Sequence, residues 1–521
     1  MGGWWSSTLG RVLAGAGCGV VSWLVPPGLA DEVTARARAE AGAAAAEAGQ
    51  EPRRRRFRVL PDRLGVYFVL GLCLYSHLPY GQVLRELTGG LRAALAAAGW
   101  AGPSSAALTG VRRRLGERPF ELLFLALAGP LSPGGEPWSQ LCGLLAVAWD
   151  GTTVKVPASA ENTAAFGKPG HKGKNGKGPA SGEAAYPAAR LVTLVACGTR
   201  ALLGAAIGPL ADGERKLAAG LAGRLRLGML LLAGRGFYSC PLWKDAAGTG
   251  AHLLWRVQAG VHLPVVRRLP DGSWLSQVSD PAAARRRREV NGKRRRRGSP
   301  LPPLAGPLPG TIAVRVIEFL VTVTDRDTGK DRTERYRMIT TLLGWQAAPA
   351  PALAAGYARR WAVETSYREF KTYLRGPGRV LRARTPGLAR QEIWAYLVIC
   401  QVIRAVIALA AAGAGLDPAR LSFTTALHAA RRTQETARRD LPAALAEAGT
   451  EILAAPVPER PGRVCARAVN EPHAPFPSRH NQKKPLAQHV TYTVTITPPG
   501  QNIPHTLSQP KHPQTPETQP P

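Results

Sequence analysis

The stretch from Tyr357 to Lys371 (YARRWAVETSYREFK) restricts the fold most, because it predicts one helix with a single polar face. No proline or glycine interrupts it, and its Ala, Arg, Glu and Lys residues favour a helix. At about 100° per residue, five polar side chains fall within an arc of roughly 80°: Tyr357, Arg360, Glu364, Tyr367 and Lys371. Two interpretations stay open: a face around Glu364 that binds phosphate and metal, or a solvated face with ordinary ion pairs.

A second carboxylate follows an apolar run far upstream. The segment LCGLLAVAWDG (141–151) predicts a buried strand that ends in a turn at Asp150 and Gly151, and TTVKVPAS predicts a second strand. An aspartate after a buried strand is more often a turn former than a ligand. Asp150 and Glu364 in one site could nevertheless hold Mg²⁺ through oxygen ligands, and two such ions could serve phosphodiester chemistry.

The charge balance indicates a polyanionic partner. Lys and Arg number 68 against 35 Asp and Glu, a formal net charge of +33. This excess favours nucleic acid over an acidic membrane surface. A coding bias toward arginine is the alternative, but it would explain Arg in place of Lys and not the shortage of acids. Seven separated cysteines with no CxxC or zinc spacing predict reduced thiols in a cytoplasmic protein.

Two apolar segments resemble membrane signals only in part. Residues 9–30 carry Arg11 near their start, as a signal peptide does, but glycines and prolines interrupt them and VPPGLADEV predicts a turn and a helix. Residues 393–413 contain Gln401 and Arg404, which favours a buried core helix over a membrane-spanning one.

These motifs resemble the DDE transposases of insertion sequences, in the IS-four group, over most of residues 20–450. The family spacing Tyr-x2-Arg-x3-Glu-x6-Lys is matched by Tyr357, Arg360, Glu364 and Lys371, and WDGTTVKVP matches the segment of the first aspartate, Asp150. Residues 60–91 resemble the family's N-terminal domain. LLLAGRGFYS (230–239) resembles its second-aspartate segment.

The resemblance implies an α/β fold: a ribonuclease-H-like mixed sheet with flanking helices, interrupted by a β-rich insertion and preceded by a helical N-terminal domain. The expected parts are a flexible N-terminus (1–19), a helical DNA-binding domain (20–128), the first part of the core (141–250), the insertion (251–343) with a basic loop at 284–298, the helical remainder of the core carrying Glu364 (344–450) and a disordered tail (455–521).

The resemblance also implies Mg²⁺-dependent cleavage at transposon ends and transfer of the freed 3′-hydroxyl into target DNA. Members bind terminal inverted repeats of double-stranded DNA as dimers or larger synaptic complexes, in the bacterial cytoplasm at the nucleoid and with no membrane partner. On this basis Asp150 and Glu364 would be catalytic metal ligands, Arg360 and Lys371 would hold phosphates, and Tyr357 would position the DNA strand.

One position departs from the family pattern. Where members have Ala-Asp-Arg-x-Phe, residues 233–237 are Ala-Gly-Arg-Gly-Phe, so Gly234 replaces the second aspartate and offers no side-chain ligand. The nearest acids in sequence are not placed by the motif: Asp212, Glu214 and Asp245. Our hypothesis is a catalytically impaired copy in which one of two Mg²⁺ sites is affected. The alternative is a non-enzymatic DNA-binding derelict that represses transposition, and an RNA-binding protein is disfavoured because no RNP-like motif occurs.

Overall fold

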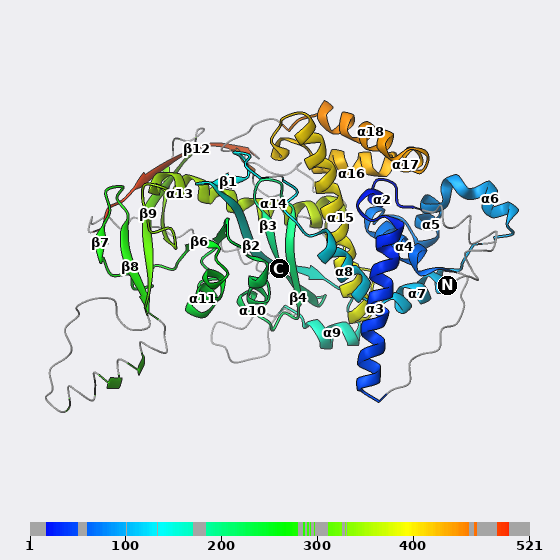
Figure 1. Ribbon diagram of the computed structural model, residues 1–521, viewed down its shortest axis with the longest axis horizontal. Helices are drawn as coiled ribbons and strands as arrows, with labels where there is room; N and C mark the ends of the chain where they lie inside the picture. Colours follow the sequence, from blue (N-terminus) through cyan, green and yellow to red (C-terminus); the bar gives the residue numbers. More distant parts are fainter. Residues whose placement is uncertain are drawn as a thin grey trace, which may run out of the picture. The chain divides into compact units, whose positions relative to one another are not determined.

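The chain folds into two compact units in this computed structural model (Figure 1). One unit comprises Met1–His252 with Ala358–Glu459, and the other Leu253–Tyr357 with Arg460–Pro521. Besides scattered positions between 285 and 329, the residues that the structure describes are 17–49, 60–169 apart from 101 and 133, 184–279, 311–325, 331–457, 463–465 and 487–499.

A mixed sheet forms the centre of the first unit. Strand β2 (Leu144–Lys155) has the parallel strand β5 (Met229–Ala233) on one side and the antiparallel strand β3 (Ala188–Ala196) on the other, and β4 (Leu202–Gly208) pairs with β3. The short β1 (Gln140–Leu141) also pairs with β2. All five residues of β5 are buried, as expected for a strand between covered faces.

Strand β2 continues through Asp150, contrary to the turn predicted there. Its pairing with β5 ends at Ala148, but its pairing with β3 runs on to Lys155. Asp150 and Gly151 therefore lie where β2 changes from two hydrogen-bonded neighbours to one. A strand can carry a polar residue at such a place, because one edge is open to other elements.

Helices cover both faces of this sheet. Helix α14 (Trp361–Arg368) packs against β2 and β3, and α10 (Glu214–Ala219) packs against β3, β4 and β2. The side chain of Asp150 meets Arg360, the residue that caps the start of α14, whereas the Cα of Gly151 faces α10. Successive residues of a strand point to opposite faces, so the two helices lie on opposite sides. The remaining helices around the sheet are α9 (Ala160–Phe166), η2 (Ala222–Arg224) and α11 (Cys240–Gly248).

The N-terminal part of this unit is helical, as predicted. Its helices α4 and α8 pack against α15 (Pro386–Gly413). The elements in chain order are α2 (Val21–Leu24), α3 (Pro27–Glu47), α4 (Asp62–Leu74), α5 (Tyr80–Thr88), η1 (Gly89–Leu91), α6 (Arg92–Ala97), α7 (Ser105–Leu115) and α8 (Arg118–Leu127). After α15 follow η5 (Pro418–Arg420), α16 (Phe423–Arg432), α17 (Gln434–Arg439) and α18 (Leu441–Ala454).

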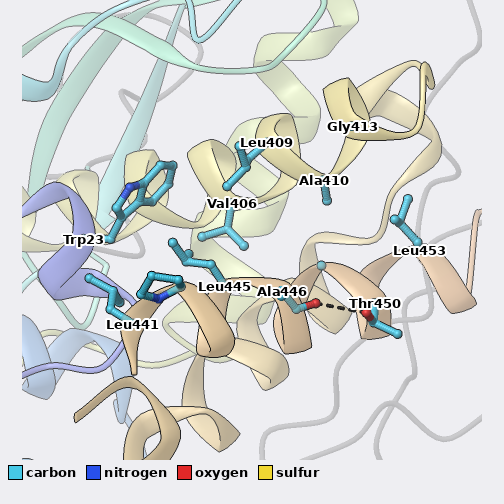
Figure 2. A pocket seen from close by; sticks show the side chains of 12 residues that line it. Trp23, Val406, Leu409, Ala410, Gly413, Leu441, Leu445, Ala446, Thr450 and Leu453 are labelled. Atoms are coloured by element: carbon cyan, nitrogen blue, oxygen red, sulfur yellow. Dashed lines mark hydrogen bonds between the residues drawn. The ribbon is translucent and has the colours of Figure 1, made fainter. Parts of the chain in front are cut away.

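Helix α15 is a core helix and not a membrane span, as its polar residues predicted. It is long and apolar enough to cross a membrane, but 83% of its most apolar window is buried inside the protein. Gln401 accepts a hydrogen bond from the Leu202 amide at 2.8 Å, and Arg404 pairs with Glu369. Toward its C-terminal end, α15 forms an apolar groove with α18 and Trp23 (Figure 2). The volume of this groove is about 600 Å³.

The second unit is an antiparallel sheet. Its order is β11 (Arg463–Cys465), β12 (Ala487–Ile496), β9 (Thr311–Asp325), β10 (Asp331–Thr340) and β6 (His252–Arg256). Strand β8 (Trp274–Ser279) pairs with the first part of β9 and with β7 (Arg267–Arg268), and α13 (Ala350–Gly356) completes the unit among the described residues.

Strands β11 and β12 lie in the segment predicted as a disordered tail, which corrects that prediction for residues 463–465 and 487–496. Strand β8 pairs with β9 only as far as Val316, and β12 pairs with the remaining edge from Phe319 to Asp325. An unpaired strand edge readily recruits a partner, and the sequence VTYTVTI supplies β-branched and aromatic residues for it. Most of the predicted basic loop at 284–298, the N-terminus before Gly17 and most of the rest of the tail lie outside the described residues.

Candidate active site

The sheet brings Asp150 and Gly234 side by side. The last parallel pair between β2 and β5 joins Ala148 to Leu232. Extending that register by two residues places Asp150 opposite Gly234, just beyond the end of β5. The first-aspartate position and the altered second-aspartate position are therefore neighbours, because two strands of the same direction end their pairing here.

Arg360 joins the carboxylates of Asp150 and Glu364. Its Nη1 donates to Asp150 Oδ2 at 3.0 Å, and its Nη2 donates to Glu364 Oε1 at 2.9 Å. The arginine side chain is 14% exposed, so this bridge is partly shielded from water. Asp150 Oδ1 also accepts from the Gly151 amide at 2.8 Å. The structure thus unites the two predicted carboxylates, although more than 200 residues separate them in sequence.

Gly234 leaves room for a side chain. Apart from its neighbours in the chain, a Cβ atom there would meet only Arg360 Nη1, at 4.0 Å. Gly234 has no positive φ that would require glycine. An aspartate would therefore fit this position beside the guanidinium of Arg360, so neither packing nor backbone geometry explains the loss of the acid.

Among the residues that the structure describes, no nearby acid takes the place of an aspartate at position 234. Glu214 lies against Gly151 on the α10 face of β2, with its Oε1 3.4 Å from Arg190 Nη1. Burial, followed by the charge of Asp150, raises the pKa of Glu214. Asp212 pairs with Lys216 at 2.6 Å. Within the described ranges, no three His, Cys, Asp or Glu residues gather closely enough to hold a metal ion.

The donor set does not fit a centre for two Mg²⁺ ions. Such ions take six oxygen ligands in strict geometry, and a pair of them needs carboxylates to balance their charge. Here two carboxylates share one guanidinium and the third position has no side-chain oxygen. Asp150 and Glu364 are the residues that would hold a divalent cation.

The predicted helix from Tyr357 to Lys371 is helical throughout but not a single α-helix. It begins as a 3₁₀ turn, η3 (Tyr357–Arg360), continues as α14 and ends as a π-helix, η4 (Glu369–Leu374). The polar stripe calculated at 100° per residue therefore does not extend over its full length. Tyr357 is buried, with its ring 6.4 Å from that of Tyr336, and Lys371 lies half-buried in the π-helix.

Two contacts of this helix were missed by reasoning from the sequence. The hydroxyl of Tyr367 donates to the carbonyl oxygen of Asp150 at 2.6 Å. Glu369 is buried between Arg200 and Arg404. The place of Tyr367 on the predicted polar face was a signal for its contact with Asp150. No local pattern indicates the cluster of Glu369, Arg200 and Arg404, because these residues are far apart in the chain.

Comparison with known families agrees with this arrangement. Residues 142–402 match the family model described as "Transposase DDE domain", and residues 30–125 match "Insertion element 4 transposase N-terminal". The fold is thus the ribonuclease-H-like α/β fold of DDE enzymes, with a helical N-terminal region. The chain belongs to the DDE transposases of the IS4 family.

A curated relative covers most of the chain. The transposase InsG of insertion sequence element IS4 from Escherichia coli (strain K12) is 26% identical over 442 residues, which span 83% of this chain and 90% of the relative. Among solved structures, a piggyBac transposase synaptic complex with hairpin DNA covers 85% of this chain and 86% of its own, at 9% identity and a TM-score of 0.37. The family assignment does not depend on that weak structural likeness.

Proposed function

We propose that this chain binds the terminal inverted repeats of its insertion sequence as a dimer or larger complex, and that its strand cleavage and transfer are impaired by Gly234. The observation that carries the proposal is the Arg360 bridge between Asp150 and Glu364 beside an open position 234. Asp150 and Glu364 are the retained metal ligands. Mg²⁺, when bound to a complete site, would supply an activated nucleophile and stabilise the leaving oxygen.

The proposed DNA binding rests on charge and on family membership. With 68 Lys and Arg residues against 35 acids, the chain attracts phosphates over much of its surface. We assign the helical part at 20–128 to repeat binding, and Arg360 and Lys371 to phosphates near the scissile bond. We also assign Tyr357 to positioning the DNA strand, because it begins the helical stretch that carries Arg360 and Lys371. Its ring is buried.

The decisive experiment compares this chain with its Gly234→Asp variant in Mg²⁺-dependent cleavage of terminal-repeat DNA. Mutating a residue that hydrogen-bonds to a metal ligand typically lowers activity about 10- to 100-fold. Restoring a metal ligand itself should therefore raise the cleavage rate by at least about 100-fold. Gly236→Asp is the matched control, because a Cβ there meets nothing within 4 Å and the new carboxylate lies two residues past the site. Equal, robust cleavage by the unmodified chain and Gly234→Asp would show that the impairment does not exist.

The second candidate function is repression of transposition without catalysis. It is favoured by the same absence of a third acid among the described residues. On this reading of the site, Gly234→Asp still fails to cleave while both forms bind repeats tightly, and the unmodified chain lowers the transposition frequency of an active relative in the same cell. Unchanged transposition frequency at full repeat occupancy would exclude a repressor.

A further inference from the structure

Tyr367 lies on α14, three residues after Glu364, and is buried against the sheet. Its hydroxyl oxygen makes three hydrogen bonds. It donates to the Asp150 carbonyl oxygen at 2.6 Å and accepts from the Thr193 amide at 3.1 Å and from Thr193 Oγ1 at 2.9 Å. A phenol has one donor and two acceptor positions, so all of them are occupied.

The three bonds meet at one point of the sheet. Asp150 of β2 and Thr193 of β3 are direct partners in the antiparallel register. The Tyr367 hydroxyl therefore joins α14 to both strands at the residue that carries the first carboxylate.

We propose that Tyr367 is a positioning residue that holds the main chain of Asp150 at a fixed place relative to α14, and thereby relative to Glu364. This inference rests on the proposed roles of Asp150 and Glu364. The Arg360 bridge joins the same two elements, but only through side-chain tips that are partly exposed. A buried hydroxyl bonded to main-chain atoms leaves less freedom, and catalytic groups must be held within about 0.5 Å of their working geometry.

The smallest change that removes the contact is Tyr367→Phe. The ring would still fill its space, but the Thr193 amide, Thr193 Oγ1 and the Asp150 carbonyl would each lose a partner. The matched control is Thr199→Val in the turn after β3. The Thr199 hydroxyl is also buried and bonded to main-chain atoms, since it donates to the Pro130 carbonyl at 2.6 Å and accepts from the Ala201 amide at 3.2 Å, but it contacts neither Asp150 nor α14.

The first test measures repeat cleavage in the Gly234→Asp background. Because a misplacement of about 1 Å can cost 100-fold, Tyr367→Phe should lower the cleavage rate at saturating DNA by roughly 10- to 100-fold and leave the Kd for repeat DNA unchanged. Thr199→Val should lower Tm about as much as Tyr367→Phe does, because each variant loses buried hydrogen bonds, but it should leave that cleavage rate unchanged. The inference is overturned if both variants cleave equally fast, if both slow alike, or if only the Kd changes.

The second test uses the chain without Gly234→Asp and needs no activity. Amide hydrogen exchange followed by mass spectrometry should show that Tyr367→Phe accelerates exchange in both β2 (144–155) and α14 (361–368). Exchange that rises in only one of these segments, or in neither, contradicts the positioning role. If Tyr367→Phe does not fold, Thr193→Val removes one of the three bonds and should give the same two-segment pattern more weakly.

The two tests separate failure of this inference from failure of the proposed function. An inactive Gly234→Asp variant would count against impairment by Gly234 alone, and the exchange pattern would still decide the role of Tyr367. An active variant whose rate is insensitive to Tyr367→Phe would leave the proposed function intact and remove the positioning role.

Discussion

Glu369 shows how much the helical stretch from Tyr357 to Leu374 depends on one buried charge. Its carboxylate lies 2.9 Å from Arg200 Nη1 and also pairs with Arg404, and all three side chains are less than one-fifth exposed. Burial lowers the pKa of both arginines, because the low-dielectric interior disfavours their charged forms. Glu369 is the first residue of the π-helix, so this cluster anchors the segment that follows Glu364 to α15 and to the turn after β3.

We expect Glu369→Gln to lower the free energy of unfolding by about 3–5 kcal/mol, because it removes the carboxylate that two buried guanidinium groups share. Urea unfolding is the measurement. Glu435→Gln is the control, since Glu435 pairs with Arg439 at 3.2 Å on the exposed surface of α17 and such pairs contribute less than about 1 kcal/mol. A loss for Glu369→Gln no larger than for Glu435→Gln would mean that the buried cluster does not stabilise the fold.

At the residue scale, local spacing could predict part of the site. The four-residue spacing from Arg360 to Glu364 and the motif at Asp150 were enough to expect the two carboxylates in one site, and a separate motif at 230–239 identified Gly234 as the altered position. The contact of Tyr367 with Thr193 could not be predicted, because it depends on which residue of β3 lies opposite Asp150. That register is set by the packing of the whole sheet.

At the scale of elements, patterns predicted the kind of structure better than its ends. The apolar runs gave β2 and β5, and the polar interruptions in α15 indicated a buried helix. The continuation of β2 past Asp150 was missed because it depends on β3 alone. The π-helix was missed because its composition suits an α-helix equally well, and β12 was missed because its partner edge on β9 belongs to a distant segment.

The packing of α4 against α7 gives a prediction at this scale. A Cβ at Gly65 would collide with Val111 and come within 2.9 Å of Leu115, so the two helices approach closely only because position 65 lacks a side chain. Gly65→Ala should destabilise the protein by about 1–3 kcal/mol through overpacking.

The control for Gly65→Ala is Gly81→Ala on α5, where a Cβ meets nothing within 4 Å. This change should stabilise by about 0.5–1 kcal/mol, because alanine favours a helix over glycine. Thermal unfolding of both variants gives the comparison. Shifts of Tm in the same direction for Gly65→Ala and Gly81→Ala would show that helix propensity, and not the α4–α7 contact, dominates.

At the scale of the whole molecule, charge has a role that no single residue explains. Many acids of the first unit are engaged by arginines in the described residues, including Asp150, Glu364 and Glu369. The formal net charge of +33 comes from the excess of 68 Lys and Arg over 35 Asp and Glu in the whole chain. Such an excess binds any DNA, so specific recognition of terminal repeats has to be separated from attraction to phosphate.

Salt dependence separates these two contributions. If the chain contacts 6–10 phosphates, its affinity for random DNA should fall by about 10³- to 10⁵-fold between 50 and 200 mM salt, while its preference for repeats over random DNA of equal length persists. Fluorescence anisotropy titrations at stepped salt concentrations measure both quantities. Lys371→Ala should reduce the salt slope by about 1 on both DNAs if Lys371 holds a phosphate. Equal affinity for repeat and random DNA at every salt concentration would show that the chain binds DNA through charge alone. Counterion release changes the affinity for both DNAs, but it does not remove a preference that comes from base contacts.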